Sequence, residues 1–207
     1  MIKIYYSILK PKETTIKIKR SEFIGNAKKL HTEEEAKEFI KEISSKYRNA
    51  THNCWAYKVE GNKFNYSDNG EPSGTAGKPI FGVIEKHNLI NIAIVVTRYF
   101  GGVKLGVRGL IDAYSQCAEN TILNSKIAKY IDLKIYEVKT DYSKYAEIER
   151  LLKRVDGWKM TKQEFMADVK FEIAIEESKE KEILEILKTK GTIKYLKNDE
   201  IGIEIKN

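Results

Sequence analysis

Apolar residues mark the predicted helices and strands along this chain, and the densest apolar run lies near its middle. Residues 90–96 are apolar except for one asparagine, which predicts a strand that is buried on both faces. Leu110–Ile122 has apolar residues at a spacing near 3.6, which predicts a helix. The segment between these two elements contains four glycines and three cations.

That glycine-rich segment is a candidate anion site. A strand that ends in glycines and leads into a helix exposes backbone N–H groups at the positive end of the helix dipole. Basic side chains add to this charge, although the alternative that the glycines only allow turning and close packing stays open. Neither a G-x-G-x-x-G string nor a G-K-[ST] string is present. The candidate anion- or nucleic-acid-binding residues are Arg98, Lys104, Arg108, Lys78, Gly101 and Gly102.

The first part of the chain has a pattern that predicts the order β-α-β-β-α-β-α. The helix after Thr32 begins with a capping box, because Glu35 follows three residues later. Gly61 and Asn62 predict the turn of a hairpin. The predicted elements before the central strand are one strand over Thr14–Phe23 continuing to Lys28, a helix ending near Tyr47, strands at Asn53–Val59 and Lys63–Tyr66, and a helix burying Ile80, Val83 and Ile84.

A second glycine-rich loop, Ser67–Ile80, joins the hairpin to the next helix. It is a candidate polar site, and the alternative is a plain turn followed by a helix cap, which Ser73 or Thr75 could supply. Because strand-end loops of α/β layers converge, we expect the two glycine-rich loops to share one crevice. The candidate polar residues of this loop are Asp68, Glu71, Ser73 and Thr75.

The second part of the chain repeats a β-α-β-β-α-β pattern, which is typical of the ferredoxin-like fold. Ser178 is expected to cap its second helix, and Gly191 is expected to end it. We place the domain boundary between residues 130 and 131, giving domains 1–130 and 131–207. The predicted elements are strands 133–138, 159–166, 168–175 and 201–205, with helices at 144–155 and from 178 onward.

Charge is divided unevenly between these two parts. Residues 1–130 contain 21 Lys and Arg against 13 Asp and Glu, a net charge of +8, and the remainder contains 16 against 17, a net charge of −1. A basic module favours a polyanionic partner such as RNA or the ribosome, whereas scattered lysines also suit an ordinary solvated surface. Both interpretations stay open.

Cysteine usage and hydropathy point to the cytoplasm. Cys54 and Cys117 lie far apart without a C-x-x-C motif, so we expect free thiols in a reducing compartment. No apolar run approaches the length of a membrane span, and residues 1–10 lack a signal-peptide core. His52 and Cys54 have no second His/Cys pair nearby, so we predict neither a metal site nor a cofactor. We expect no membrane partner, and the oligomeric state is left open.

Four sequence strings resemble those of the IMPACT family, whose bacterial members are also called the YigZ family. The resemblance covers most of the first part of the chain in family order. The strings are RSEF at Arg20–Phe23, HNCWAY at His52–Tyr57, SDNGEPSGTAGKP at Ser67–Pro79 and VVTRYFGGVKLGVRGL at Val95–Leu110. One departure is that Arg108 stands where the family commonly has glycine, and Asp112 where it often has a cation.

The resemblance implies an α+β protein of two domains. The first would be of the ribosomal protein S5 domain 2-like type, with two helices on one face of a four-stranded sheet. The second would be ferredoxin-like and would resemble the last domain of elongation factor G. Eukaryotic relatives act in translational control, and RNA or ribosome binding is the usual inference for bacterial relatives.

Three functional hypotheses follow from the sequence. The leading hypothesis is a non-enzymatic, translation-associated regulator that binds RNA or the ribosome through its basic first domain. The rival is an enzyme or ligand-binding protein that acts on a phosphorylated or nucleotide ligand at the two glycine-rich loops, using Asp68, Glu71, His52 and Arg98. A third possibility is a module that binds a protein of the translation machinery.

Overall fold

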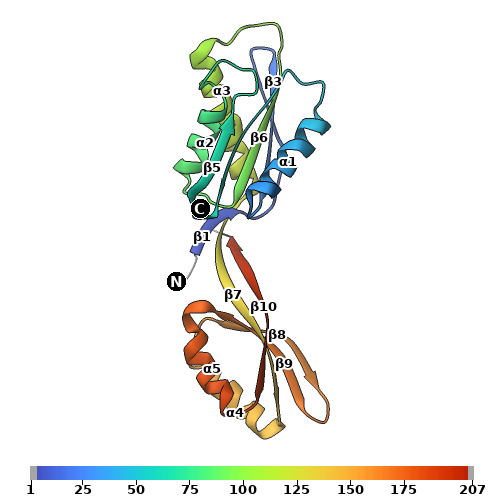
Figure 1. Ribbon diagram of the computed structural model, residues 1–207, viewed down its shortest axis with the longest axis vertical. Helices are drawn as coiled ribbons and strands as arrows, with labels where there is room; N and C mark the ends of the chain where they lie inside the picture. The colour runs from blue at the N-terminus through green and yellow to red at the C-terminus, as the bar shows by residue number, and fades with distance from the viewer. Residues whose placement is uncertain (1–3, 205–207) are drawn as a thin grey trace. The chain divides into compact units, whose positions relative to one another are not determined.

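The computed structural model describes residues 4–204 and shows an α+β protein with antiparallel sheets (Figure 1). Its residues divide into two compact units. The N-terminal unit comprises Tyr5–Lys129 with residues 203–204, and the C-terminal unit comprises Tyr130–Gly202 with Ile4.

The N-terminal unit contains a five-stranded sheet in the order β2-β3-β6-β4-β5. Strand β6 lies at its centre and pairs antiparallel with both β3 and β4. The strands are β2 (Thr14–Ile18), β3 (Ser21–Lys29), β4 (His52–Val59), β5 (Lys63–Ser67) and β6 (Ile92–Tyr99), with a 3-10 turn at Glu60–Asn62. The helices are α1 (Glu33–Lys46), α2 (Gly77–Lys86) and α3 (Gly106–Ser125).

Strand β6 is buried on both faces, which confirms the prediction from its continuous apolar run. Ile92, Ile94 and Val96 pack into the apolar core formed with α2 and α3. Ala93 and Val95 pack into a second core with α1. Since successive side chains of a strand point to opposite faces, helices cover both faces of the sheet (Figure 1).

This arrangement differs from the one that the resemblance implied. The described sheet has five strands instead of four, because β2 and β3 are separate strands. Helices α2 and α3 share one face, as expected, but α1 covers the other face. Strand β1 (Ile4–Ile8) was not predicted from the sequence; in sheet order it neighbours β7, which belongs to the second sheet.

The prediction of one strand over Thr14–Phe23 was wrong. Ile18 pairs with Ser21, so β2 and β3 form a hairpin through the two-residue turn Lys19–Arg20. Both turn residues have positive φ, 43° and 68°. Positive φ at both central residues is what a type I′ hairpin turn requires, and Asn-Gly or Asp-Gly is its usual signal. Lys-Arg gives no such signal.

Helix caps were predicted with mixed success. The capping box of α1 is present, with Thr32 accepting from the Glu35 N–H and Glu35 accepting from the Thr32 N–H. Ser178 was wrongly expected to cap the last helix. That serine lies inside a 3-10 turn, Glu177–Lys179, and α5 begins after it without a side-chain cap among the described residues.

The C-terminal unit follows the predicted β-α-β-β-α-β order. The second sheet has the strand order β1-β7-β9-β8, and β10 also pairs with β7. Side chains of α4 and α5 enclose one apolar core with β7 and β9. The elements are β7 (Ile127–Thr140), α4 (Tyr142–Leu152), β8 (Trp158–Phe165), β9 (Val169–Glu176), α5 (Glu180–Lys188) and β10 (Thr192–Glu204).

No helix within residues 4–204 combines the length and apolarity that a membrane crossing needs.

A fragment of residues 130–207 is expected to unfold in one cooperative transition. The buried residues of its core all lie between Tyr136 and Leu187, so the fragment keeps that core complete. Thermal unfolding followed by circular dichroism tests this expectation. A well-expressed fragment that loses its ellipticity gradually, without a sigmoidal transition, would show that its core needs the rest of the chain.

Candidate functional site

Four connecting segments meet at the carboxyl end of β6. Strands β3 and β4 both run antiparallel to β6, and their first residues pair with its last ones, Glu22 with Tyr99 and His52 with Arg98. The turns that precede those strands and the loops that follow β5 and β6 therefore lie at the same end. We call this region the loop end. It comprises residues 19–20, 47–51, 68–76 and 100–105.

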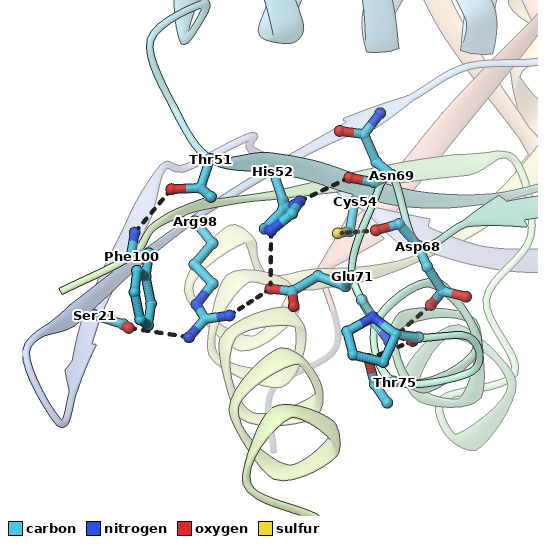
Figure 2. Close-up of polar contacts among 12 residues, drawn as sticks. Ser21, Thr51, His52, Cys54, Asp68, Asn69, Glu71, Thr75, Arg98 and Phe100 are labelled. Atoms are coloured by element: carbon cyan, nitrogen blue, oxygen red, sulfur yellow. Dashed lines mark hydrogen bonds and ion pairs between the residues drawn. The ribbon is translucent and has the colours of Figure 1, made fainter. Parts of the chain in front are cut away.

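The centre of the loop end is a buried ion pair between Arg98 and Glu71 (Figure 2). The two residues are 4% and 9% exposed. Arg98 Nη1 lies 2.6 Å from Glu71 Oε1, and Nη2 donates to Ser21 Oγ over 3.2 Å. The Tyr114 hydroxyl donates to the same Glu71 oxygen over 2.9 Å. Each charge is therefore met by an opposite charge and a further hydrogen bond, as buried charges require.

Aromatic rings hold the Arg98 guanidinium in place. Its central carbon lies 5.4 Å from the ring centre of Phe23 and 5.3 Å from that of Phe100, both within cation–π range. The Arg98 Nε is buried and has no hydrogen-bond partner among the described residues. Arg98 was predicted to bind an anion. In the structure it is buried, and its two terminal nitrogens already bind Glu71 and Ser21.

His52 lies beside this ion pair. Its Nδ1 is 2.8 Å from the Asn69 carbonyl oxygen, so in the neutral ring Nδ1 carries the proton and donates. Its Nε2 is 3.9 Å from Glu71 Oε1 (Figure 2). The ring thus has a fixed orientation, with an acceptor nitrogen near the buried carboxylate.

Cys54 lies two residues after His52 and is a buried, unreactive thiol. Its thiol donates to the Asp68 carbonyl over 2.9 Å, and it also lies 3.4 Å from the Tyr114 hydroxyl. Burial raises the pKa of Cys54 to about 12. Because the thiolate is the nucleophilic form, Cys54 is not suited to covalent catalysis.

Asp68 holds the glycine-rich loop Ser67–Ile80 in shape. Its carboxylate accepts backbone N–H bonds from Gly74, Ala76 and Gly77 at 2.8 to 2.9 Å. Burial by itself would raise the pKa of Asp68, but the three N–H bonds outweigh it and lower the pKa below its usual value of 3.8. Asp68 therefore stabilises the entry to α2, where the helix exposes unpaired N–H groups.

The prediction that Ser73 or Thr75 caps α2 was wrong, because Asp68 takes that role. The Thr75 hydroxyl is buried and donates to the Pro72 carbonyl over 2.6 Å. Ser73 is exposed. The acid of the Asp-Asn-Gly turn could have suggested this cap. The N–H groups that it accepts lie eight and nine residues later, beyond the spacing of an ordinary N-cap.

The glycine-rich loop between β6 and α3 contains positions that require glycine. A Cβ on Gly101 would lie 1.9 Å from the backbone oxygen of Arg20, so this loop packs directly on the β2–β3 turn. Gly106 begins α3 with φ 74°. Gly102 lies between them on the surface with φ 82°.

Arg108 stands where the resemblance implies a glycine, and its position does not require one. It lies in the first turn of α3, and its φ is not positive. Its Nε lies 3.3 Å from the carboxylate of Asp112, one helical turn later. The two departures from the family pattern therefore pair with each other on the surface.

Both glycine-rich loops line one cavity of about 450 Å³. Arg98 and Lys104 are its cationic lining residues, whereas Lys78 is exposed in the first turn of α2 and does not line it. Apolar side chains and the start of α3 supply much of the remaining wall. The lining residues are Thr51, His52, Glu71, Pro72, Arg98, Phe100, Lys104, Leu105, Gly106, Val107 and Leu110.

Around this cavity the loop end has an excess of positive charge. Its nearby acids are already engaged: Glu71 by Arg98, Asp112 by Arg108, Glu22 by Lys17 and Asp68 by backbone N–H groups. Five exposed cations have no carboxylate within ion-pair distance in the part of the chain that the structure describes. They are Lys19, Arg20, Arg48 and Lys104 in the loop end, and Lys78 in the first turn of the adjoining helix α2.

Sequence reasoning did not identify three residues that build the site. Tyr114 was assigned to the apolar face of α3, and Ser21 and Phe23 were assigned to an ordinary strand. Tyr114 could have been suspected, because a buried tyrosine needs a partner for its hydroxyl. The hydroxyl of Ser21 and the ring of Phe23 gave no signal, since their role depends on the register between β3 and β6.

This architecture defines an α+β protein with a cavity lined by two glycine-rich loops. The model of the Impact N-terminal domain matches residues 19–122 of the chain. The chain belongs to the IMPACT family.

Similar proteins support the same conclusion over most of the chain. IMPACT family member YvyE of Bacillus subtilis is 37% identical over 86% of this chain and 82% of its own length. IMPACT family member YigZ of Escherichia coli is 31% identical over 78% of this chain and 81% of its own. The fold is also similar to that in a crystal structure of a hypothetical protein, which is 27% identical. The match has a TM-score of 0.64 and covers 93% of this chain and 96% of the other.

Replacing Asp68 with alanine is expected to lower the free energy of unfolding by about 1 to 2 kcal/mol at pH 7. Three backbone N–H groups then lose their acceptor. Urea denaturation at several pH values measures the effect. Because the pKa of Asp68 is lowered by folding, its contribution is complete above pH 3.8 and is lost as the pH falls through the lowered pKa.

The control is Asp68→Asn, which keeps one acceptor oxygen but cannot titrate. Its stability difference from the unchanged protein should shrink at low pH. A difference that stays constant down to pH 2 would contradict the assigned role of the carboxylate.

Proposed function

We propose that this chain is a translation-associated protein of the cytoplasm whose N-terminal unit binds RNA, alone or on the ribosome, through the loop end. The observation that carries the proposal is the set of five exposed, unpaired cations around one end of the sheet. Unpaired cations attract phosphates without first breaking an ion pair. Each nearby acid is engaged by a cation or by backbone N–H groups, Glu71 and Asp68 within the fold and Glu22 and Asp112 on the surface.

Phe100 adds a feature that suits single-stranded RNA. It is 45% exposed at the mouth of the cavity, and Arg98 contacts its ring. An exposed aromatic ring beside cations is the arrangement on which unpaired bases stack. Lys104 and Arg20, in the adjoining loop and turn, supply the charge for the backbone.

The fold supports a place in translation. The C-terminal unit has the sheet order β10-β7-β9-β8, with both helices enclosing its core, as a ferredoxin-like domain resembling the last domain of elongation factor G would have. The helix pair α2 and α3 on one face of the N-terminal sheet suits an S5 domain 2-like domain. Fold alone does not determine function, so these likenesses only add to the charge argument.

A second candidate function is binding or conversion of a phosphorylated small ligand. The cavity between the two glycine-rich loops favours it, because ligand sites of this size are concave, mostly apolar and contain a few convergent polar groups. In that function His52 and Glu71 are the groups placed to exchange a proton with the ligand.

Binding of a fluorescent single-stranded RNA across a salt series tests the leading proposal. Arg98 is unsuitable for mutation, because its loss would leave Glu71 buried and unpaired. The variant is instead Arg20→Ala with Lys104→Ala. If each residue contacts one phosphate, the slope of log affinity against log salt should become shallower by roughly 1.4, about 0.7 per contact.

The matched control is Lys37→Ala with Lys41→Ala, which removes the same charge from the exposed side of α1. It should leave the slope nearly unchanged. Equal effects of the two pairs would show that only net charge matters. Absence of RNA binding at low salt would refute the proposal and favour the small-ligand or protein-partner alternatives.

A further inference from the structure

We propose that the cavity at the loop end is a binding site for a phosphate monoester of a nucleotide. The inference rests on the second candidate function above, that the cavity is a ligand site, and it names the ligand class. Three independent features of the cavity carry it: the start of α3, the cationic lining, and the apolar wall beside an exposed aromatic ring.

The start of α3 is open toward the cavity. Leu105, Gly106 and Val107 line it, and the helix runs for 20 residues from Gly106. In the described part of the chain no side chain caps this end, and its first turn contains no acidic residue. The free N–H groups and the dipole of a long helix therefore face a space in which an anion fits.

The cation Lys104 reinforces this positive potential, and Arg98 offers a hydrogen-bond donor. Lys104 is exposed at the rim and has no carboxylate partner within residues 4–204. Arg98 also lines the cavity, and the small part of this residue that is exposed amounts to 4%. Its Nε has no hydrogen-bond partner among the described residues, so the guanidinium retains one donor that neither Glu71 nor Ser21 uses. Glu71 is neutralised by Arg98, so the local balance stays positive.

The remaining wall determines what the anion is attached to. Pro72, Leu105, Val107 and Leu110 are apolar, and Phe100 offers part of its ring. A volume of about 450 Å³ exceeds what a bare phosphate needs and lies in the range of small-molecule pockets. A base or ribose next to the phosphate fills such a space and can stack on Phe100.

A monoester fits this arrangement better than a diester. A terminal phosphate carries a charge of about −1.5 to −2 at pH 7 and offers three free oxygens. Those oxygens can accept from the helix N–H groups and from Lys104 together. The ligand can come from two sources, a free mononucleotide or the phosphorylated end of an RNA strand.

Calorimetric titration of the full chain with 5′-AMP, adenosine and 3′,5′-cyclic AMP tests the ligand class. We expect 5′-AMP to bind at least about tenfold more tightly than either of the others, since charged hydrogen bonds are lost without the terminal phosphate. Adenosine binding as tightly as 5′-AMP would overturn the phosphate assignment and keep the cavity as a ligand site. Absence of binding by all three would overturn both.

Val107 provides a variant that separates binding from folding. It is 61% exposed in the first turn of α3, where an acid favours the helix dipole. Val107→Glu should therefore weaken 5′-AMP binding roughly tenfold or more without lowering the melting temperature. Val107→Gln has the same size without the charge, so the difference between the two variants reports electrostatics. Equal binding by both would refute the placement of the phosphate.

Lys104→Ala should also weaken 5′-AMP roughly tenfold, and Lys41→Ala on α1 should not. RNA carrying a 5′-phosphate, compared with the same RNA ending in a hydroxyl, distinguishes the two sources. Preference for the phosphorylated RNA assigns the site to strand ends, whereas 5′-AMP binding without such preference assigns it to free nucleotides. RNA binding that ignores the 5′-phosphate, together with no 5′-AMP binding, would overturn this inference and leave the RNA proposal standing.

Discussion

The buried ion pair between Arg98 and Glu71 is the interaction on which the loop end depends. It joins the end of β6 to the loop before α2, and its hydrogen bonds extend it to Ser21 on β3 and Tyr114 on α3. Desolvating two charges is costly, so such a pair adds little stability by itself. Removing one partner costs much more, because the other charge stays buried. The pair therefore fixes geometry: four chain segments can close together only in the arrangement that satisfies both charges.

This constraint separates two kinds of positive charge. Arg98 is neutralised inside the protein, held between Phe23 and Phe100, and forms part of a rigid floor. Lys104 and Arg20 lie outside, unpaired and exposed, where their charge can act on a partner. Sequence composition counts all three as equal contributions to the basic excess. The structure shows that only the exposed ones contribute to the field that an approaching polyanion meets.

Much of the fold could be predicted from the sequence, because periodicity reports burial directly. The central strand and the capping box after Thr32 were identified from local patterns alone. The site was harder, because its contacts join residues far apart in the chain, such as Arg98 with Glu71 and Tyr114 with Glu71. Candidate residues could be chosen by type, but which cation is buried depends on strand register. Asp68 likewise appeared to be a turn residue, and only the folded loop shows it gathering three N–H groups.

The β2–β3 turn limits which substitutions this surface can accept. Lys19 and Arg20 adopt left-handed backbone angles that side-chain-bearing residues rarely adopt, at a conformational cost on the order of 1 kcal/mol each. Asparagine and glycine would relax that strain, so drift toward greater thermostability would favour them. Such drift would also remove two of the exposed cations. At this turn, therefore, a substitution that stabilises the hairpin would at the same time lower the positive charge of the surface.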